Sequence, residues 1–167
     1  MWDMFLKGGL LMWPILALSV WALTVIVWKV SRLSALLREL RRDAPAGSLA
    51  PLWETKISGA PDKALRYAVS RLILSEERHI ESLSLIATLS PLLGLTGTVM
   101  GIIETFQVLS SAGLVEANAL AGGIWQALLT TVAGLLVAMP AYAAFHALEG
   151  VLSTLELRLE ERFFSDS

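Results

Sequence analysis

Among the polar side chains of two long, mostly apolar stretches of the sequence, six are candidates for a role in an ion pathway. The six are Thr98, Glu104, Thr105, Gln126, Thr130 and Thr131. Uncharged hydroxyls suit the wall of a membrane pore, because they hydrogen-bond water or a partner carboxyl without adding a charge that would trap an ion. These residue types therefore favour ion conduction in which the titrating carboxyl belongs to a partner. The alternative is that Thr98 and Thr131 bond the carbonyl four residues back in their own helices.

Glu104 and Gln126 differ from the threonines in the free-energy cost of placing them in a membrane and in their position. A carboxylate at membrane depth costs a few kcal/mol and usually faces a cavity or a partner, so Glu104 is a candidate for a proton pathway. Glu104 also lies near the end of its apolar stretch, where exposure at the membrane interface is the alternative. On a helix that turns about 100° per residue, Gln126 is about 40° from Thr130 but about 140° from Thr131. Gln126 and Thr131 therefore cannot share one narrow stripe.

The sequence lacks the motifs of common enzymes. It contains no HExxH, GxSxG, GxGxxG or Walker sequence and no cysteine, which excludes disulfides, thiolate nucleophiles and cysteine metal sites. His79 and His146 stand at the edges of apolar stretches without a second ligand nearby. We interpret them as packing or interface residues, with a proton relay as the alternative. We expect no enzyme activity, no metal and no cofactor, and a net charge of -2 gives no reason to expect nucleic acid.

The composition is that of a membrane protein. Hydrophobic residues make up 55% of the chain and charged residues 17%, against about 25% charged residues in soluble domains. The apolar stretches 10–30, 82–109 and 119–146 are each long enough to supply the ~20 residues that cross a bilayer. We predict an all-α polytopic membrane protein with three transmembrane helices, two of them extended into the cytoplasm. The remaining segments are predicted to be an interfacial piece (1–9), a cytoplasmic helical loop (31–81), a periplasmic loop (110–118) and a cytoplasmic C-terminal helix (147–167).

Basic residues cluster between the first two predicted spans. Ten of the thirteen lysines and arginines lie between Lys29 and Arg78. Short loops rich in lysine and arginine are retained in the cytoplasm, so the N-terminus is predicted to be periplasmic and the C-terminus cytoplasmic. We interpret the arginines of this loop as a solvated face that sets the orientation.

Small residues recur on the second and third predicted spans at helical spacing. The second span carries Gly94, Gly97 and Gly101, and the third carries Gly134 among several alanines. Small faces allow membrane helices to approach closely. Two such faces exceed what a three-helix monomer obviously needs, so we predict an oligomer. Pro140 is expected to kink the third helix or to mark where it meets the interface.

Two motifs that contain these residues resemble a known family. Residues 91–102, PLLGLTGTVMGI, resemble the PxxGLxGTVxGI signature of the MotA/TolQ/ExbB proton-channel proteins. Residues 123–135, GIWQALLTTVAGL, followed by Ala138-Met139-Pro140, are similar to the third-span signature GIxEALxxTxxGLxxAIP. The short, three-span layout looks like ExbB and TolQ rather than the four-span MotA.

The resemblance implies a fivefold assembly in the bacterial inner membrane. The second and third spans would line a central pore around two single-span ExbD- or TolR-like helices, whose membrane aspartate takes up protons. Relative rotation would transmit force to TonB- or TolA-like proteins that reach the outer membrane. Thr98 and Thr131 match the pore-facing threonines of the family, whereas Gln126 stands where the family commonly has glutamate. The alternative function is a non-conducting membrane scaffold that holds partner helices together.

Overall fold

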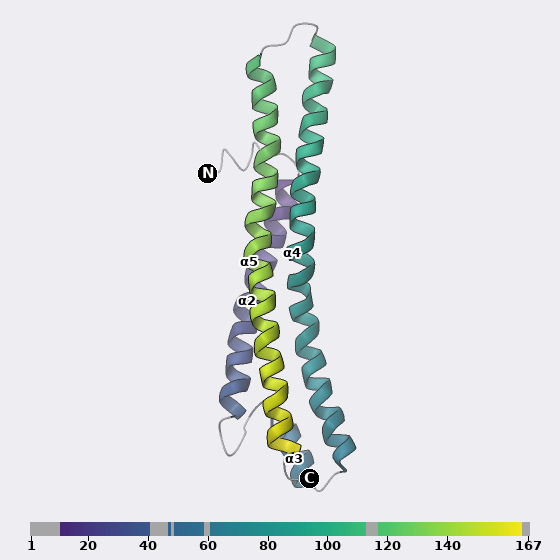
Figure 1. Cartoon of the computed structure of the whole chain (residues 1–167), viewed down its shortest axis with the longest axis vertical. Coiled ribbons are helices and arrows are strands. Elements are labelled where there is room, and N and C mark those ends of the chain that lie inside the picture. Colours follow the sequence, from purple (N-terminus) through teal and green to yellow (C-terminus); the bar gives the residue numbers. More distant parts are fainter. Residues whose placement is uncertain (1–10, 41–46, 48, 59–60, 113–116, 165–167) are drawn as a thin grey trace. The chain divides into compact units, whose positions relative to one another are not determined.

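The computed structural model describes residues 11–40, 47, 49–58, 61–112 and 117–164, and within these ranges the chain forms four α-helices (Figure 1). They are α2 (Met12–Leu40), α3 (Ala50–Ile57), α4 (Asp62–Ala112) and α5 (Ala117–Phe164). The prediction of an all-α protein is confirmed. The predicted interfacial piece 1–9 lies outside the described residues.

Three of these helices are long and apolar enough to cross a membrane, as predicted: α2, α4 and α5. Helix α4 has 51 residues and α5 has 48, more than twice the ~20 that a bilayer requires. Helix α4 continues to Ala112 and α5 begins at Ala117, so helix occupies both ends of the stretch predicted as a periplasmic loop.

Both internal prolines lie within continuous helices. Pro91 is inside α4 and Pro140 is inside α5. Each proline removes one backbone donor, a loss that membrane helices tolerate because neighbouring groups re-satisfy the freed carbonyl. Pro140 therefore does not end its helix.

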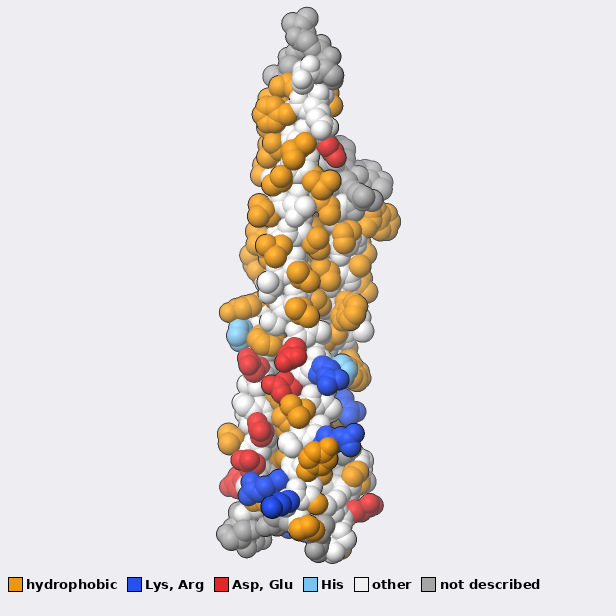
Figure 2. All heavy atoms as spheres, turned by 90° about the vertical axis from the view of Figure 1, so that its right-hand side faces the viewer, with side chains coloured by type: hydrophobic (Ala, Val, Ile, Leu, Met, Phe, Trp, Pro, Cys, Tyr) orange, Lys and Arg blue, Asp and Glu red, His pale blue; other side chains and the backbone are white. Residues whose placement is uncertain are grey.

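The chain divides into two compact units. Unit 1 comprises residues 1–23 and 84–143. Its buried positions are mostly small, including Gly94, Gly97, Gly134 and Ala138, whereas large apolar side chains such as Trp21 and Leu136 are exposed. Figure 2 shows hydrophobic side chains over the visible face of this unit. This is the pattern expected in lipid, where outward apolar groups cost nothing and helices associate through close packing.

Unit 2 comprises residues 24–83 and 144–167 and has a different interior. Its core is built of large aliphatic side chains from all four helices: Leu33, Leu36, Leu40, Leu52, Leu65, Ile73, Leu83, Leu148, Leu155 and Leu159 are all buried. Charged side chains gather over its visible face (Figure 2). Unit 2 therefore resembles a water-soluble helical bundle, in which burial of apolar surface supplies the driving force.

Helix α3 joins this bundle where α2 and α5 end. Leu52 of α3 is buried, and the Trp53 ring packs edge-on against Phe163 with centroids 5.4 Å apart. Nζ of Lys56 donates to the carbonyl oxygen of Arg162 at 3.2 Å, and Nη1 of Arg162 donates to the carbonyl oxygen of Leu40 at 2.5 Å. The two cations thus satisfy carbonyls that the ends of α5 and α2 leave without helical partners.

Candidate functional site

Helices α4 and α5 lie side by side in unit 1 at a spacing that only small residues allow (Figure 1). A Cβ added to Gly94 would lie 2.9 Å from the carbonyl oxygen of Thr130, and one added to Gly101 would lie 2.8 Å from the Cβ of Ala127. A Cβ on Gly97 would overlap the hydroxyl of Thr130, and one on Gly134 would overlap the carbonyl oxygen of Ser90. All four glycines predicted for helix packing therefore lie in one contact.

This contact changes the argument for an oligomer. From the sequence alone, the small faces of the second and third spans are surplus surface that other copies of the chain could use. In the structure the two faces pack against each other within one chain. Oligomerisation thus stays a prediction, and it rests on what the resemblance to the MotA/TolQ/ExbB proteins implies.

Thr98 and Thr131 face each other across the same contact. Their hydroxyl oxygens are hydrogen-bonded to one another, and both side chains are part-buried. Oγ1 of Thr131 donates to the carbonyl oxygen of Gly94 at 3.0 Å, while Oγ1 of Thr98 lies 3.2 Å from the carbonyl oxygen of Ala127. Oγ1 of Thr98 is also 3.3 Å from the carbonyl oxygen of Gly94, which lies four residues back in the same helix. Thr131 therefore does more than bond its own helix, because its hydroxyl donates to a backbone carbonyl of α4.

Thr130 and Thr105 occupy different surroundings. Thr130 is 2% exposed, and its hydroxyl lies between the helices, 2.7 Å from the carbonyl oxygen of Ala127 and 3.2 Å from that of Gly94. Thr105 is half-exposed and donates to the carbonyl oxygen of Gly101 in its own helix at 2.7 Å. In a single chain, Thr130 is thus enclosed, whereas Thr105 remains accessible. Their predicted place in a pore wall stays a prediction.

Gln126 is half-exposed on α5, and Glu104 is exposed on α4. Neither residue joins the threonine cluster, in which the hydroxyls of Thr98, Thr130 and Thr131 surround two backbone carbonyls, those of Gly94 and Ala127. Each hydroxyl carries one proton and can also accept, so the Thr98–Thr131 pair can accept a hydrogen bond from a protonated carboxyl, and it can donate to an ionised one only by giving up one of its present bonds. Among the described residues, no group of three or more His, Asp or Glu side chains is placed to hold a metal ion.

The two histidines lie in unit 2 and are both exposed. Nδ1 of His79 is 2.9 Å from the carbonyl oxygen of Ser75, and its ring packs edge-on against Trp28. Nδ1 of His146 is 3.4 Å from a carboxylate oxygen of Glu149. Their assignment as packing or interface residues stays a prediction.

A buried ionic cluster in unit 2 was not predicted. Nζ of Lys29 is 2.5 Å from Oε2 of Glu76 and also donates to the carbonyl oxygen of Glu76 at 3.0 Å. Nε of Arg32 is 2.8 Å from Oε1 of the same carboxylate. The side chain of Lys29 is 0% exposed and that of Glu76 is 4% exposed. Lys29, unlike the half-exposed Arg32, is therefore enclosed within unit 2.

Two opposing effects act on the Glu76 carboxyl. Burial alone would raise its pKa, but hydrogen bonds from Lys29 and Arg32, together with their positive charges, hold the pKa below its ordinary value. Because folding lowers this pKa, ionised Glu76 stabilises the folded chain at pH values above the ordinary pKa of 4.5. This stabilisation is lost as the pH falls through the lower pKa of the folded state.

Replacing Glu76 with glutamine should lower the free energy of unfolding by about 3–5 kcal/mol, because Lys29 is left buried without a counter-charge. Denaturant titration of the purified protein in mild detergent at pH 7 measures the loss. The double variant Lys29→Met, Glu76→Leu removes both charges and should recover most of it. Between pH 7 and pH 3 the unmodified protein should lose stability more steeply than the double variant. A double variant as unstable as Glu76→Gln would contradict the role given to the ion pair.

Comparison with known proteins agrees with the two sequence signatures. The family model described as the MotA/TolQ/ExbB proton channel family matches residues 45–161. The biopolymer transport protein exbB1 of Vibrio cholerae is 47% identical over 88 residues, which cover 49% of this chain and 39% of that protein. The putative biopolymer transport protein ExbB-like 1 of Synechocystis is 33% identical over 183 residues, covering 90% of this chain and 71% of that protein.

A third relative belongs to another system. The Tol-Pal system protein TolQ of Haemophilus influenzae is 35% identical over 120 residues, covering 72% of this chain and 49% of that protein. The chain thus spans less than half the length of the Vibrio and Haemophilus proteins that it matches. The family match covers both signatures and all the residues of the α4–α5 contact. The chain therefore belongs to the MotA/TolQ/ExbB proton channel family, as a membrane protein of the ExbB and TolQ type.

Proposed function

We propose that this chain is a subunit of a proton-driven motor of the bacterial inner membrane, and that the exposed side of the Thr98–Thr131 pair lines its ion pathway. The observation that carries the proposal is the pairing of two part-buried, uncharged hydroxyls at the glycine-lined contact of α4 and α5. In a unit whose surface is otherwise largely apolar, this pair offers hydrogen bonds to an ion carrier without trapping it electrostatically.

The titrating group of the motor is proposed to belong to a partner. The threonine pair is uncharged, and Gln126 is an amide that does not change charge. An ExbD- or TolR-like single-span protein with a membrane aspartate would supply the carboxyl, inside a homopentamer of this chain. Force would pass to a TonB- or TolA-like protein for transport at the outer membrane. The N-terminus would be periplasmic and the C-terminus cytoplasmic, because the basic residues cluster from Lys29 near the end of α2 to Arg78 in α4.

A non-conducting scaffold is the second candidate. In a scaffold, the contact of Gly94, Gly97, Gly101 and Gly134 would serve only to pack α4 against α5 within the chain. A scaffold would bind the same single-span partner but would need no accessible hydroxyls. The two functions therefore differ in proton flow and not in assembly.

Reconstitution separates the two functions. The chain is purified with a single-span partner and placed in lipid vesicles that contain a pH-sensitive dye, and an electrical potential is then imposed. We expect internal acidification with the complex, and none with the chain alone or with a partner whose membrane aspartate is replaced by asparagine. An intact complex that gives no more acidification than the asparagine control would refute the motor and leave the scaffold.

A further inference from the structure

A stripe of exposed side chains runs along the part of α4 that belongs to unit 2. The members of this α4 stripe are Tyr67, Arg71, Leu74, Arg78 and Glu81, and all of them are exposed. On a helix that turns about 100° per residue, they fall within about 80° of one another. Tyr67 lies about 160° from Leu65 and from Val69, which are both buried. The α4 stripe therefore points away from the interior of unit 2.

A second stripe runs along α5 in the same unit. The members of this α5 stripe are His146, Glu149, Ser153, Glu156 and Glu160, and they are exposed as well. They also fall within about 80° of one another. The α4 stripe carries two arginines and one glutamate, whereas the α5 stripe carries three glutamates and one histidine. The two stripes are therefore largely opposite in charge.

Most charges of the two stripes have no ionic partner within the chain. The two arginines of the α4 stripe form no ion pair with any residue that the structure describes, and neither do Glu156 and Glu160. Glu149 meets a member of its own stripe, since its carboxylate is 3.4 Å from Nδ1 of His146. The arginines of one stripe and the glutamates of the other are thus available to another molecule.

The two stripes have the same spacing in opposite directions. Starting from Tyr67, the α4 stripe advances by four, three, four and three residues. Starting from Glu160, the α5 stripe goes back by four, three, four and three residues. Side by side and antiparallel, their members therefore meet as Tyr67 with Glu160, Arg71 with Glu156, Leu74 with Ser153, Arg78 with Glu149, and Glu81 with His146. No pair brings like charges together.

The stripes also lie at matching heights. The guanidinium carbon of Arg66 is 4.3 Å from the centroid of the Phe164 ring, which relates the heights of α4 and α5 in unit 2. With a rise of about 1.5 Å per residue, Arg71 lies about 7.5 Å beyond this contact and Glu156 about 12 Å beyond it. An arginine and a glutamate side chain span the difference of about 4.5 Å. Copies of one membrane protein insert with the same orientation, so the α4 stripe of one copy is level with the α5 stripe of another.

We propose that the α4 stripe of one copy of this chain docks against the α5 stripe of a second copy. Tyr67 and Leu74, which are 66% and 61% exposed, bury apolar surface in this contact. The two arginine–glutamate pairs fix its register, since complementary charges give specificity more than affinity. The inference rests on the proposed function for the presence of several copies in one assembly, and it adds the surfaces of unit 2 through which they meet.

Cysteine cross-linking tests this contact directly, because the chain has no cysteine of its own. Leu74→Cys and Ser153→Cys are placed on two differently tagged copies that are expressed together and oxidised in the membrane. Every charge of both stripes stays in place in these variants. We expect a cross-linked dimer that carries both tags, and the absence of this dimer would overturn the proposal.

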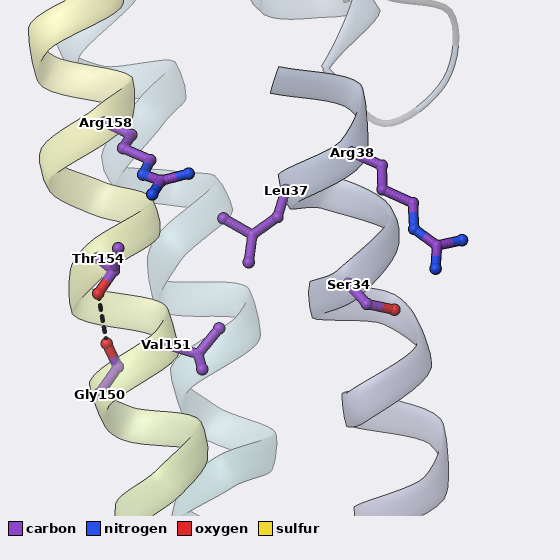
Figure 3. A pocket seen from close by; sticks show the side chains of 7 residues that line it. All are labelled: Ser34, Leu37, Arg38, Gly150, Val151, Thr154 and Arg158. Carbon is purple, nitrogen blue, oxygen red and sulfur yellow. Dashed lines mark hydrogen bonds between the residues drawn. The ribbon is translucent and has the colours of Figure 1, made fainter. Parts of the chain in front are cut away.

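Leu74→Cys combined with Thr154→Cys is the matched control. Thr154 is exposed and adjacent to Ser153 in the sequence, but it points about 100° away on the helix. There it lines a groove between α5 and α2, together with Val151 and Arg158 (Figure 3). The control pair should give little cross-linked dimer. Equal or greater cross-linking of the control pair would show that the two copies do not meet through the α5 stripe.

Charge reversal on separate copies tests the register. Arg71→Glu on the copy that carries Leu74→Cys should lower the yield of the cross-linked dimer about tenfold, because two glutamates then meet. Glu156→Arg on the copy that carries Ser153→Cys should restore the yield, because the reversed charges now meet across the two copies. A yield that stays low would refute the pairing of Arg71 with Glu156.

Native mass spectrometry of the unmodified protein in mild detergent separates this inference from the proposed function. Oligomers of a chain that gives no Leu74–Ser153 cross-link would refute the contact between the stripes alone. Monomers would refute both this contact and the assembly of several copies that the proposed function requires.

Discussion

Leucine in place of Gly97 should separate α4 from α5 and sharply reduce the amount of folded protein in the membrane. Even a single Cβ at this position would overlap the hydroxyl of Thr130 and lie 2.8 Å from its Cβ. Overpacking of a close contact costs about 1–3 kcal/mol for a few extra methylenes, and leucine adds four carbon atoms at a place where the neighbour is buried. Membrane abundance, together with resistance to unfolding by a harsh detergent, measures the effect.

Gly122→Leu is the matched control for this prediction. Gly122 also lies on a helix of unit 1 and is exposed, and a Cβ added there would meet no atom within 4 Å. Its leucine variant should retain nearly normal abundance, because an outward leucine is compatible with lipid. Gly97→Ala should fall between the two. Equal losses for Gly97→Leu and Gly122→Leu would show that loss of glycine, and not the closeness of α4 and α5, is responsible.

Removing the hydroxyls of Thr98 and Thr131 together should abolish proton-dependent uptake at the outer membrane while leaving the protein folded. Valine keeps the branching of threonine, and a hydrogen bond between membrane helices contributes only about 0.6 kcal/mol on average. The carbonyl oxygen of Gly94 keeps a second hydroxyl, that of Thr130, at 3.2 Å. The structural loss is therefore small, whereas the functional loss should be nearly complete if the pair contacts the partner carboxyl.

The experiment compares Thr98→Val, Thr131→Val with Thr96→Val at matched membrane abundance. Thr96 is exposed on the same helix, and its hydroxyl donates to the carbonyl oxygen of Leu92 at 2.8 Å. Thr96→Val should support normal uptake. Gln126→Ala should be mild, because an amide does not carry protons by changing charge. Normal uptake by the double variant would return Thr98 and Thr131 to a role in helix packing.

The long helices were predictable because apolar length and helical spacing are local properties of a sequence. The start of α4 at Asp62, directly after Pro61, follows from such signals. The spacing of Gly94, Gly97 and Gly101 indicated a packing face, but spacing alone could not say whether that face serves the same chain or another copy. The structure answers this through Thr130 and Thr131, which approach Gly94 from α5.

Sequence reasoning failed where two distant residues had to be paired. Thr130 and Thr131 are adjacent, so their directions differ by about 100°, and only the position of α4 decides which hydroxyl is enclosed. The pairing of Lys29 with Glu76 spans 47 residues and requires that α2 and α4 pack together. Charge clustering averages over such residues, so it described the loop as a whole and missed the burial of Lys29, which is the buried lysine among the residues that the structure describes.

The burial of Lys29 has a consequence for the order of events during biogenesis. Lys29 precedes Glu76 in the chain, so α2 is made, and enters the membrane, before the carboxylate that will neutralise it is available. At that time the hydrated ammonium can act as a topology signal that keeps its flank in the cytoplasm. Only after α4 has been synthesised and has packed against α2 does the same ammonium become dehydrated. Under the proposed orientation, Lys29 would contribute first to the topology signal and later to the ion pair that holds α2 against α4, and a change at Glu76 would affect only the second step.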